Sequence, residues 1–284
     1  MSHRQERQEP AEGAVLAAHG MHAGYAGMAN VLDCVQVSVM AGSRLAILGP
    51  NGTGKTTLLR CLSGAHEPSS GQVLLDGVPL AQNRRGLTAH RRQVQLVLQD
   101  PDDQLFSADV RRDVSFGPMN LGLPANEVRD RVDESLELLG ITDLAGRPVH
   151  HLSYGQRKRV AIAGATAMRP RVLLLDEPTA GLDASGHALL LSALDRLEAA
   201  GTTVVLSTHD VDLAWRWADE VALVTDGQVR QEPMAKVLSD TTALAAACLA
   251  TPWPVALLHH MGRSIDPMFP PRTTADVASL MTSH

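Results

Sequence analysis

The chain has 284 residues, of which 44% are apolar, and this is enough for one large domain or two small ones. Its net charge is −6, with 25 Lys and Arg against 31 Asp and Glu, which argues against a nucleic-acid partner held by bulk electrostatics. Cys34, Cys61 and Cys248 are too few and too widely spaced for a disulfide framework or a zinc site, so a reducing cytoplasm is expected.

The N-terminal part of the sequence predicts a tail, a small sheet and a loop. Residues 1–12 are polar and are expected to form a flexible tail without an apolar signal core. From about residue 15 to residue 40, short β-rich runs alternate with Gly and Asn, which is typical of a small antiparallel sheet. "RLAIL" (44–48) predicts a strand that enters a Gly-rich loop, and "TTLLRCLSG" (56–64) predicts a helix stopped by its glycine.

The middle of the chain has helical periodicity. The segment from about 107 to 168 is predicted to be a helical subdomain. Within it, "NEVRDRVDESLELLG" (126–140) puts four apolar residues on one helical face, namely Val128, Val132, Leu136 and Leu139.

Three later segments predict buried parallel strands. "RVLLLDEP" (171–178) is apolar without alternation, as a strand covered on both faces would be, and "TTVVLSTHD" (202–210) and "EVALVTDGQV" (220–229) have the same character. Between the first two, Leu190, Leu194 and Leu197 form a helix stripe, so strands and helices alternate as in an α/β parallel sheet.

The C-terminal part, residues 233–284, is expected to be a small appendix. Its apolar tract "ALAAACLATPWPVALL" (243–258) is short for a bilayer and is interrupted by Pro252 and Pro254, so we predict no transmembrane helix.

A phosphate-binding loop is predicted at "GPNGTGKTT" (49–57), which fits the pattern G-x-x-x-x-G-K-[ST] between a strand and a helix. Its glycines let backbone N–H groups turn inward, and the following helix N-terminus adds to this anion site. Lys55 is expected to reach the β- and γ-phosphates and the Thr56 hydroxyl to ligate Mg²⁺. The predicted nucleotide-binding residues are Gly49, Pro50, Asn51, Gly52, Thr53, Gly54, Lys55, Thr56 and Thr57.

A second half-site is predicted at "LLLDEP" (173–178). Asp176 ends a buried strand, where it can hold Mg²⁺ directly or through water. Glu177 is placed to accept a proton from the attacking water, so it is the candidate general base. The cofactors expected from the two half-sites are ATP and Mg²⁺.

These motifs, followed by "LSYGQRKRVAIAGA" (152–165), "GLD" (181–183) and "STHD" (207–210), stand in the order found in ABC-transporter ATPase subunits. The resemblance covers about residues 14–232, and we expect residues 13–232 to form the ATPase domain. It implies a P-loop NTPase of the α/β class, with a parallel-sheet core, a small antiparallel β-subdomain and a helical subdomain.

The resemblance also implies roles for single residues. His209 would hydrogen-bond the γ-phosphate and the attacking water, and Gln99 would meet Mg²⁺ and that water. Asp183 would bridge a dimer interface. Tyr25 stands where this family stacks an aromatic side chain on adenine, although it can equally pack the β-sheet.

In this family two subunits pack head to tail and bury ATP between them. Ser153, Tyr154, Gly155 and Gln156 would therefore face the nucleotide on the partner subunit. Tyr154 replaces the first glycine of the usual LSGGQ motif. Because Tyr tolerates a positive φ poorly, we expect an ordinary backbone there, with the ring beside the nucleotide or the interface.

The stretch "DPDDQLF" (100–106) is interpreted as a docking site for a membrane subunit, since this family receives a short helix there. Leu105 and Phe106 would form an apolar floor, and Asp102 and Asp103 would pair with basic residues of that helix. A solvated acidic turn is the alternative.

The segment "LQDPDDQLFSADVRRDVSFGPMNLGL" (98–123) resembles the corresponding sequence of ATPases of energy-coupling-factor transporters, most of all the branch that imports cobalt or nickel ions. This implies an ATPase bound peripherally to the cytoplasmic face of the cell membrane, acting as a homodimer, or as a heterodimer with a paralogue, on integral membrane subunits. The alternatives are a vitamin such as biotin as cargo, a soluble ABC ATPase without a transport role, and a nucleotide sensor without turnover.

Overall fold

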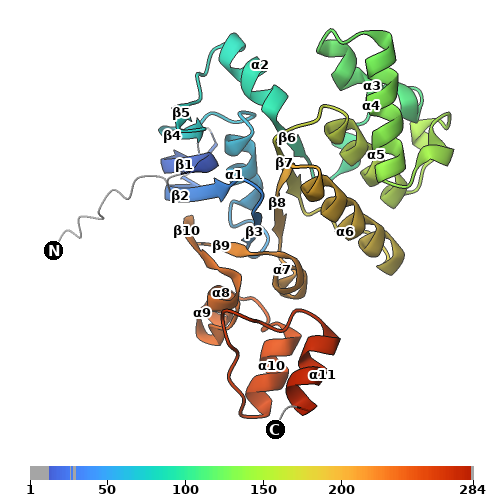
Figure 1. Ribbon diagram of the computed structural model, residues 1–284. Coiled ribbons are helices and arrows are strands. Elements are labelled where there is room, and N and C mark those ends of the chain that lie inside the picture. Colours follow the sequence, from blue (N-terminus) through green and yellow to red (C-terminus); the bar gives the residue numbers. More distant parts are fainter. Residues whose placement is uncertain (1–12, 26, 28–29, 283–284) are drawn as a thin grey trace. The chain divides into compact units, whose positions relative to one another are not determined.

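The computed structural model describes residues 13–25, 27 and 30–282, so the predicted tail at residues 1–12 lies outside the described residues. The chain divides into two compact units, whose elements are labelled in Figure 1. The first unit comprises Met1–Leu62, His66–Pro79 and Ser207–His284, and the second comprises Ser63–Ala65 and Leu80–Leu206.

The first unit contains a four-stranded antiparallel sheet of order β2-β1-β4-β5. The two strands predicted from the N-terminal segment pair with each other, and Asp76 and Gly77, both with positive φ, turn the chain between the other two. The bounds are β1 Ala14–Ala23, β2 Leu32–Met40, β4 Ser70–Leu75 and β5 Val78–Pro79.

The same unit holds the strand and helix that flank the Gly-rich loop. Strand β3 (Arg44–Leu48) pairs in parallel with β9 (Glu220–Thr225), and β10 (Gln228–Pro233) returns antiparallel to β9. Helix α1 (Lys55–Leu62) follows the loop. The segment 220–229, expected as one strand, is a hairpin, because Asp226 and Gly227 both have positive φ and form a two-residue turn.

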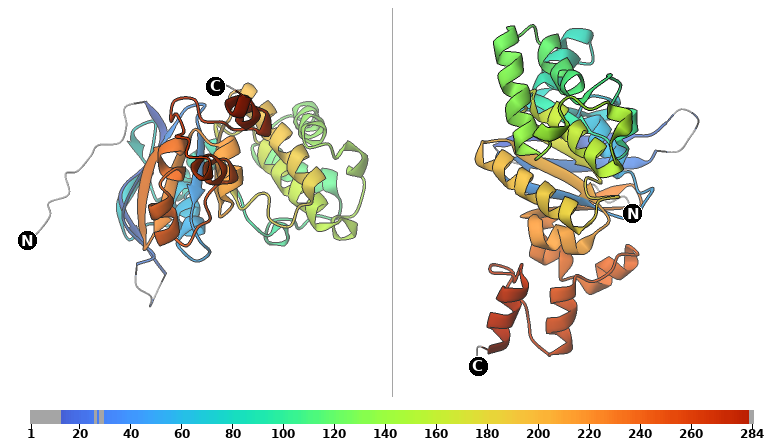
Figure 2. Two further views of the ribbon diagram at one scale, coloured as in Figure 1. Left: turned by 90° about the horizontal axis from the view of Figure 1, so that it is seen from below. Right: turned by 90° about the vertical axis from the view of Figure 1, so that its right-hand side faces the viewer.

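The C-terminal part of the first unit is helical and is tied to α7 (Val211–Trp217). The Trp215 indole Nε1 donates to the Pro271 carbonyl at 2.7 Å, and the Trp253 N–H donates to the Asp212 carboxylate at 2.8 Å. Helices α10 and α11 lie side by side (Figures 1 and 2). The bounds are α8 Met234–Leu238, α9 Thr241–Ala246, α10 Trp253–His260 and α11 Thr274–Thr282.

The second unit contains the strands β7 (Val172–Asp176) and β6 (Val94–Val97), which pair in parallel. Every residue of β7 is buried, which explains its unalternated apolar sequence. Strand β8 (Thr203–Thr208) is next to β7 in the sheet order and is also buried throughout; its last two residues belong to the first unit. These parallel strands confirm the predicted α/β class.

The helices of the second unit include a packed group, α3, α4 and α5, within the segment predicted to be helical (Figure 1). The apolar face predicted for α4 is buried, and Gly140 ends that helix with φ +61°. The bounds are α2 Arg84–Gln93, α3 Val110–Asn120, α4 Ala125–Leu138, α5 Tyr154–Thr166 and α6 Ala184–Ala199, with short 3₁₀ turns at Pro101–Asp103, Thr142–Leu144 and Val149–His151.

Candidate functional site

The loop between β3 and α1 is built for an anion. Gly52 and Gly54 have φ of +84° and +106°, values that a side chain at Cβ would strain. A Cβ at Gly49 would lie 2.6 Å from the Val224 carbonyl oxygen and 2.9 Å from the Thr53 hydroxyl. The loop therefore requires its glycines, and the N-terminus of α1 adds positive potential beside it.

Lys55 lies inside this loop rather than pointing into solvent. Its side chain is 6% exposed, and Nζ donates to the carbonyls of Gly49 at 2.7 Å and Pro50 at 3.0 Å. Carbonyl oxygens orient the ammonium without neutralising it. An ammonium held at this position can donate charge-assisted hydrogen bonds to an anion in the loop.

Tyr25 lies next to α1 in the same unit. Its hydroxyl is 3.3 Å from the Thr57 hydroxyl, and its ring contacts His66 at an interplanar angle of 40°, with centroids 5.0 Å apart. The ring keeps an exposed fraction of 39%. It does not lie buried against the β-sheet, so a flat ligand can reach it.

His209 lies at the junction of β8 and α7 in the first unit and is exposed. The residues beside it fix the junction: the Asp210 N–H donates to the Thr208 hydroxyl at 3.0 Å, and the Asp210 carboxylate caps α7 by accepting from Asp212 and Leu213 N–H.

Asp176 and Glu177 end β7 in the second unit, with exposed fractions of only 2% and 4%. Glu177 has φ +45°, the left-handed conformation that a non-glycine residue adopts rarely and that recurs at functional sites. The chain therefore places a buried carboxylate in a strained turn directly after a buried strand.

The turn after Glu177 is held by a side chain that the sequence motifs did not predict. Lys158 on α5 is 1% exposed, and its Nζ donates to the carbonyls of Glu177 at 2.5 Å and Ala180 at 3.2 Å. Burial lowers the pKa of Lys158 to about 8, and the carboxylates of Glu177, Asp176 and Asp100 partly oppose that shift. The feature that identifies Lys158 is its burial close to carboxylates. This feature is visible in the fold and not in the sequence.

The signature segment begins α5 with a capping box. The Ser153 hydroxyl accepts from the Gln156 N–H at 3.3 Å, and the Gln156 side-chain oxygen accepts from the Ser153 N–H at 2.9 Å. Because the hydroxyl oxygen acts as an acceptor in this box, its O–H remains able to donate to a ligand.

Tyr154 is the first residue of α5, and its φ is not positive. Its hydroxyl donates to the Gln99 carbonyl at 3.1 Å, and a Cβ at Gly181 would come within 2.7 Å of its ring. The ring thus packs between two loops of its own unit. Next to Gly181, Asp183 caps α6 by accepting from the Gly186 N–H at 2.7 Å.

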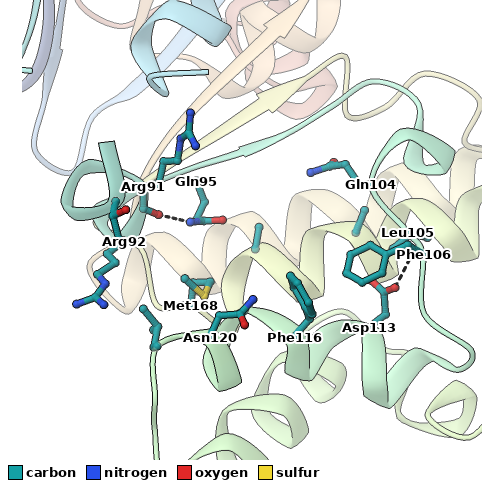
Figure 3. A pocket seen from close by; sticks show the side chains of 16 residues that line it. Arg91, Arg92, Gln95, Gln104, Leu105, Phe106, Asp113, Phe116, Asn120 and Met168 are labelled. Carbon is teal, nitrogen blue, oxygen red and sulfur yellow. Dashed lines mark hydrogen bonds between the residues drawn. The ribbon is translucent and has the colours of Figure 1, made fainter. Parts of the chain in front are cut away.

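The segment after β6 lines a cavity of about 520 Å³ within the second unit (Figure 3). The Asp113 carboxylate accepts from the Phe106 N–H at 3.0 Å and the Ser107 N–H at 2.8 Å, and so fixes the loop. Phe106 then packs edge-on against Phe116, with centroids 4.7 Å apart, while remaining 65% exposed. The lining includes Arg91, Arg92, Gln104, Leu105, Phe106, Asp113, Phe116, Leu121 and Met168.

The two predicted docking carboxylates differ. Asp102 forms an ion pair with Arg157 of its own unit at 2.8 Å, so its negative charge is partly neutralised within the chain. Among the residues that the structure describes, Asp103 is exposed without an ion pair. Asp113 and Phe116 were missed by the sequence analysis. The signal for Phe116 was the scarcity of Phe, since the chain has only three.

A family model described as ABC transporter matches residues 32–180. The chain is 56% identical over 236 residues to the cobalt import ATP-binding protein CbiO of Rhodobacter capsulatus, covering 83% of this chain and 84% of that protein. It is 45% identical over 223 residues to the energy-coupling factor transporter ATP-binding protein EcfA of Methanocaldococcus jannaschii, covering 78% and 80%.

A solved structure is also similar. CbiO1 of Clostridium perfringens, described as part of the ABC transporter complex cbiONQ, is 39% identical with a TM-score of 0.75 and covers 87% of this chain and 100% of that one. Over residues 13–25, 27 and 30–282, none of the helices combines the length and apolar content that a bilayer crossing requires.

Proposed function

This chain belongs to the ABC transporter family, as the ATP-binding, ATP-hydrolysing subunit of a transporter of the energy-coupling-factor kind, and we propose that it energises an importer of cobalt or nickel ions. The observation that carries the proposal is the glycine loop with Lys55 oriented inside it by two carbonyls. Cobalt is supported by the name of a relative at 56% identity. Nickel, or a vitamin such as biotin, would be distinguished by uptake of each cargo in cells that carry the complete transporter.

We propose that the phosphates of ATP lie in the loop 49–57, with the adenine on Tyr25. Lys55 would meet the β- and γ-phosphates and His209 the γ-phosphate. Glu177, buried and fixed in its turn, would accept the proton of the attacking water.

Mg²⁺ fits the donor set that the family motifs assign to it. The Thr56 hydroxyl, the Gln99 amide and the Asp176 carboxylate all supply oxygen, which is the ligand atom that Mg²⁺ takes in nucleotide sites. Bound Mg²⁺ would neutralise charge on the phosphates. The protein's own part is to hold Asp176 at the end of a buried strand.

The proposed assembly is a homodimer, or a heterodimer with a paralogue, in which Ser153, Tyr154, Gly155 and Gln156 of one subunit contact the nucleotide of the other. The free O–H of Ser153 in its capping box supports this role. Asp183 would lie at the same interface. Exposed apolar side chains of the C-terminal part, Met268 and Phe269 among them, support a second dimer contact there.

We further propose that the cavity beside Phe106 and Phe116 receives a helix of an integral membrane subunit, which would hold this ATPase at the cytoplasmic face of the membrane. Apolar residues of such a helix would meet Leu105 and Phe106, and a basic residue would meet Asp103. Purification in detergent tests this. Recovery with integral membrane proteins supports the proposal, and recovery without them would favour an ABC ATPase outside transport.

Glu177→Gln tests the catalytic assignment. We expect kcat to fall about 10²–10⁴-fold because the amide cannot accept the proton, while ATP binding is kept. With Mg²⁺ and ATP the variant should form a dimer, measured by its mass in solution. Asp195→Asn, on α6, is the matched control and should leave turnover unchanged. Near-normal turnover of Glu177→Gln would refute the role of Glu177, and a persistent monomer would refute the dimer.

A further inference from the structure

Two side chains near the start of α5 contact the two loops that carry Gln99 and Glu177. Tyr154 and Lys158 are four residues apart, so they lie on the same face of the helix. All of these contacts lie within the second unit.

Tyr154 contacts the loop after β6 through its hydroxyl, which donates to the Gln99 carbonyl at 3.1 Å. Gly181 lies against its ring: a Cβ at that glycine would come 2.7 Å from Cε1 and 2.9 Å from Cδ1. Gly181 also has φ +76°, so neither its backbone nor its surroundings accept a side chain. One ring therefore touches the segment before Asp183 and the carbonyl of Gln99 at once.

Lys158 contacts the turn after β7 through its ammonium, which donates to the Glu177 and Ala180 carbonyls. The same Nζ lies 5.8 Å from the centroid of the Tyr154 ring, within the range of a cation–π contact. The Ala180 N–H donates back to the Glu177 carbonyl at 3.1 Å, so the ammonium and the backbone close the same turn.

These contacts are not needed to begin α5. The capping box of Ser153 and Gln156 already satisfies the helix start, and the Tyr154 hydroxyl is directed instead to a loop carbonyl whose residue is exposed. A tyrosine in place of the glycine that the family motif has at this position therefore adds contacts to the loops and gives nothing to the cap.

We propose that Tyr154 and Lys158 are positioning residues for ATP hydrolysis. They fix the backbone of Gln99 and of Glu177 to one turn of α5, so that both side chains keep a set position relative to Ser153. The proposal rests on the catalytic roles assigned to Gln99 and Glu177. On this proposal, α5, which begins with the signature segment, also positions Glu177 of the same chain.

Steady-state ATPase of Tyr154→Phe and Lys158→Met in the full-length protein tests it. Loss of one hydrogen bond to Gln99 should lower kcat about 3–10-fold, and loss of both bonds from Lys158 should lower it by more, with KM for ATP changed less than twofold. Lys158→Arg, which can donate to both carbonyls, should recover most of the turnover. Lys236→Met removes an exposed lysine of α8 and should change nothing.

Amide hydrogen exchange gives a readout that does not depend on turnover. Lys158→Met should speed exchange of the Ala180 amide at least about tenfold, since the turn loses its side-chain bonds, while amides of β7 stay protected. Tyr154→Phe should leave the Ala180 amide unchanged.

Normal kcat in both variants, or reduced kcat with unchanged exchange at Ala180 in Lys158→Met, would overturn the proposal. If Glu177→Gln keeps its turnover, the catalytic assignment fails instead. If Glu177→Gln is inactive while both variants hydrolyse normally, only the positioning role fails.

Discussion

Two buried lysines, one in each unit, form nearly the same contacts and are expected to do different work. Lys55 and Lys158 are both under 7% exposed, and each donates to two backbone carbonyls. Around Lys55 the loop leads into the N-terminus of α1 and has exposed residues at Asn51 and Gly52. Lys158 has carboxylates as neighbours, and the turn that it contacts is closed by a backbone hydrogen bond.

Similar contacts therefore do not by themselves define a ligand site. The glycine loop and the helix start beside Lys55 suit an anion, whereas Lys158 lies among the carboxylates of Glu177, Asp176 and Asp100, which partly oppose the lowering of its pKa by burial. Lys55 is therefore expected to contact a ligand, and Lys158 to stabilise the turn that it contacts.

Nucleotide affinity should separate the two lysines most strongly. Lys55→Met should weaken ATP binding by on the order of 10²–10³-fold, because charge-assisted hydrogen bonds to the phosphates are lost. Lys158→Met should keep affinity within about threefold. Titration with a fluorescent ATP analogue measures both, and equal losses in the two variants would contradict the distinction.

Stability should rank the two variants in the opposite order. Lys158→Met leaves the carbonyls of Glu177 and Ala180 without their side-chain donor in a buried turn, and should lower the free energy of unfolding by about 2–4 kcal/mol. Lys55→Met should cost about 1 kcal/mol, because water reaches the exposed loop. Urea denaturation monitored by tryptophan fluorescence gives both values.

Substitutions of one glycine in the phosphate loop and one in the signature segment should also differ in their effect on stability. Gly49→Ala would push a Cβ against the Val224 carbonyl, a backbone atom that cannot move away, and should cost about 2–3 kcal/mol together with loss of nucleotide binding. Gly155→Ala meets only Leu182 Cδ2 at 3.1 Å and should change stability by less than about 1 kcal/mol. Thermal melts of the two variants, with and without ATP, compare them.

The stability of the wild type should also depend on pH. The pKa of Lys158 is lowered to about 8, so above that pH the folded chain releases a proton that the unfolded chain keeps up to about pH 10.4. The stability of the wild type relative to Lys158→Met should therefore rise by on the order of 1–3 kcal/mol as the pH increases from 8 to 10.4, and should stay constant below pH 8. Denaturation of both proteins across this range measures the difference, and parallel curves would contradict it.

The sequence was sufficient for the elements whose residues carry strong local signals. The unalternated run that ends at Asp176 predicted a fully buried parallel strand, and the glycines around Lys55 predicted a phosphate loop between a strand and a helix. Both follow from backbone geometry that only certain residue types accept.

Other features depend on residues that the fold brings together from distant segments. Lys158 and Ala180 are 22 residues apart and Tyr154 and Gln99 are 55 apart, so no periodicity or motif could connect them. Asp102 was predicted to be available to a partner and instead pairs with Arg157. The hairpin at Asp226 and Gly227 was missed although Asp-Gly is a strong turn signal, because the apolar run before it dominated the interpretation.

The ties of the C-terminal part to α7 have a consequence for shortened versions of this protein. Helix α7 starts two residues after His209, and it carries both Trp215, bonded to Pro271, and Asp212, bonded to Trp253. Truncation after residue 232 would strip an indole N–H and a carboxylate of their partners and uncover a wholly buried tryptophan. A fragment trimmed to the ATPase domain would therefore be altered, and prone to self-association, on the helix that follows His209.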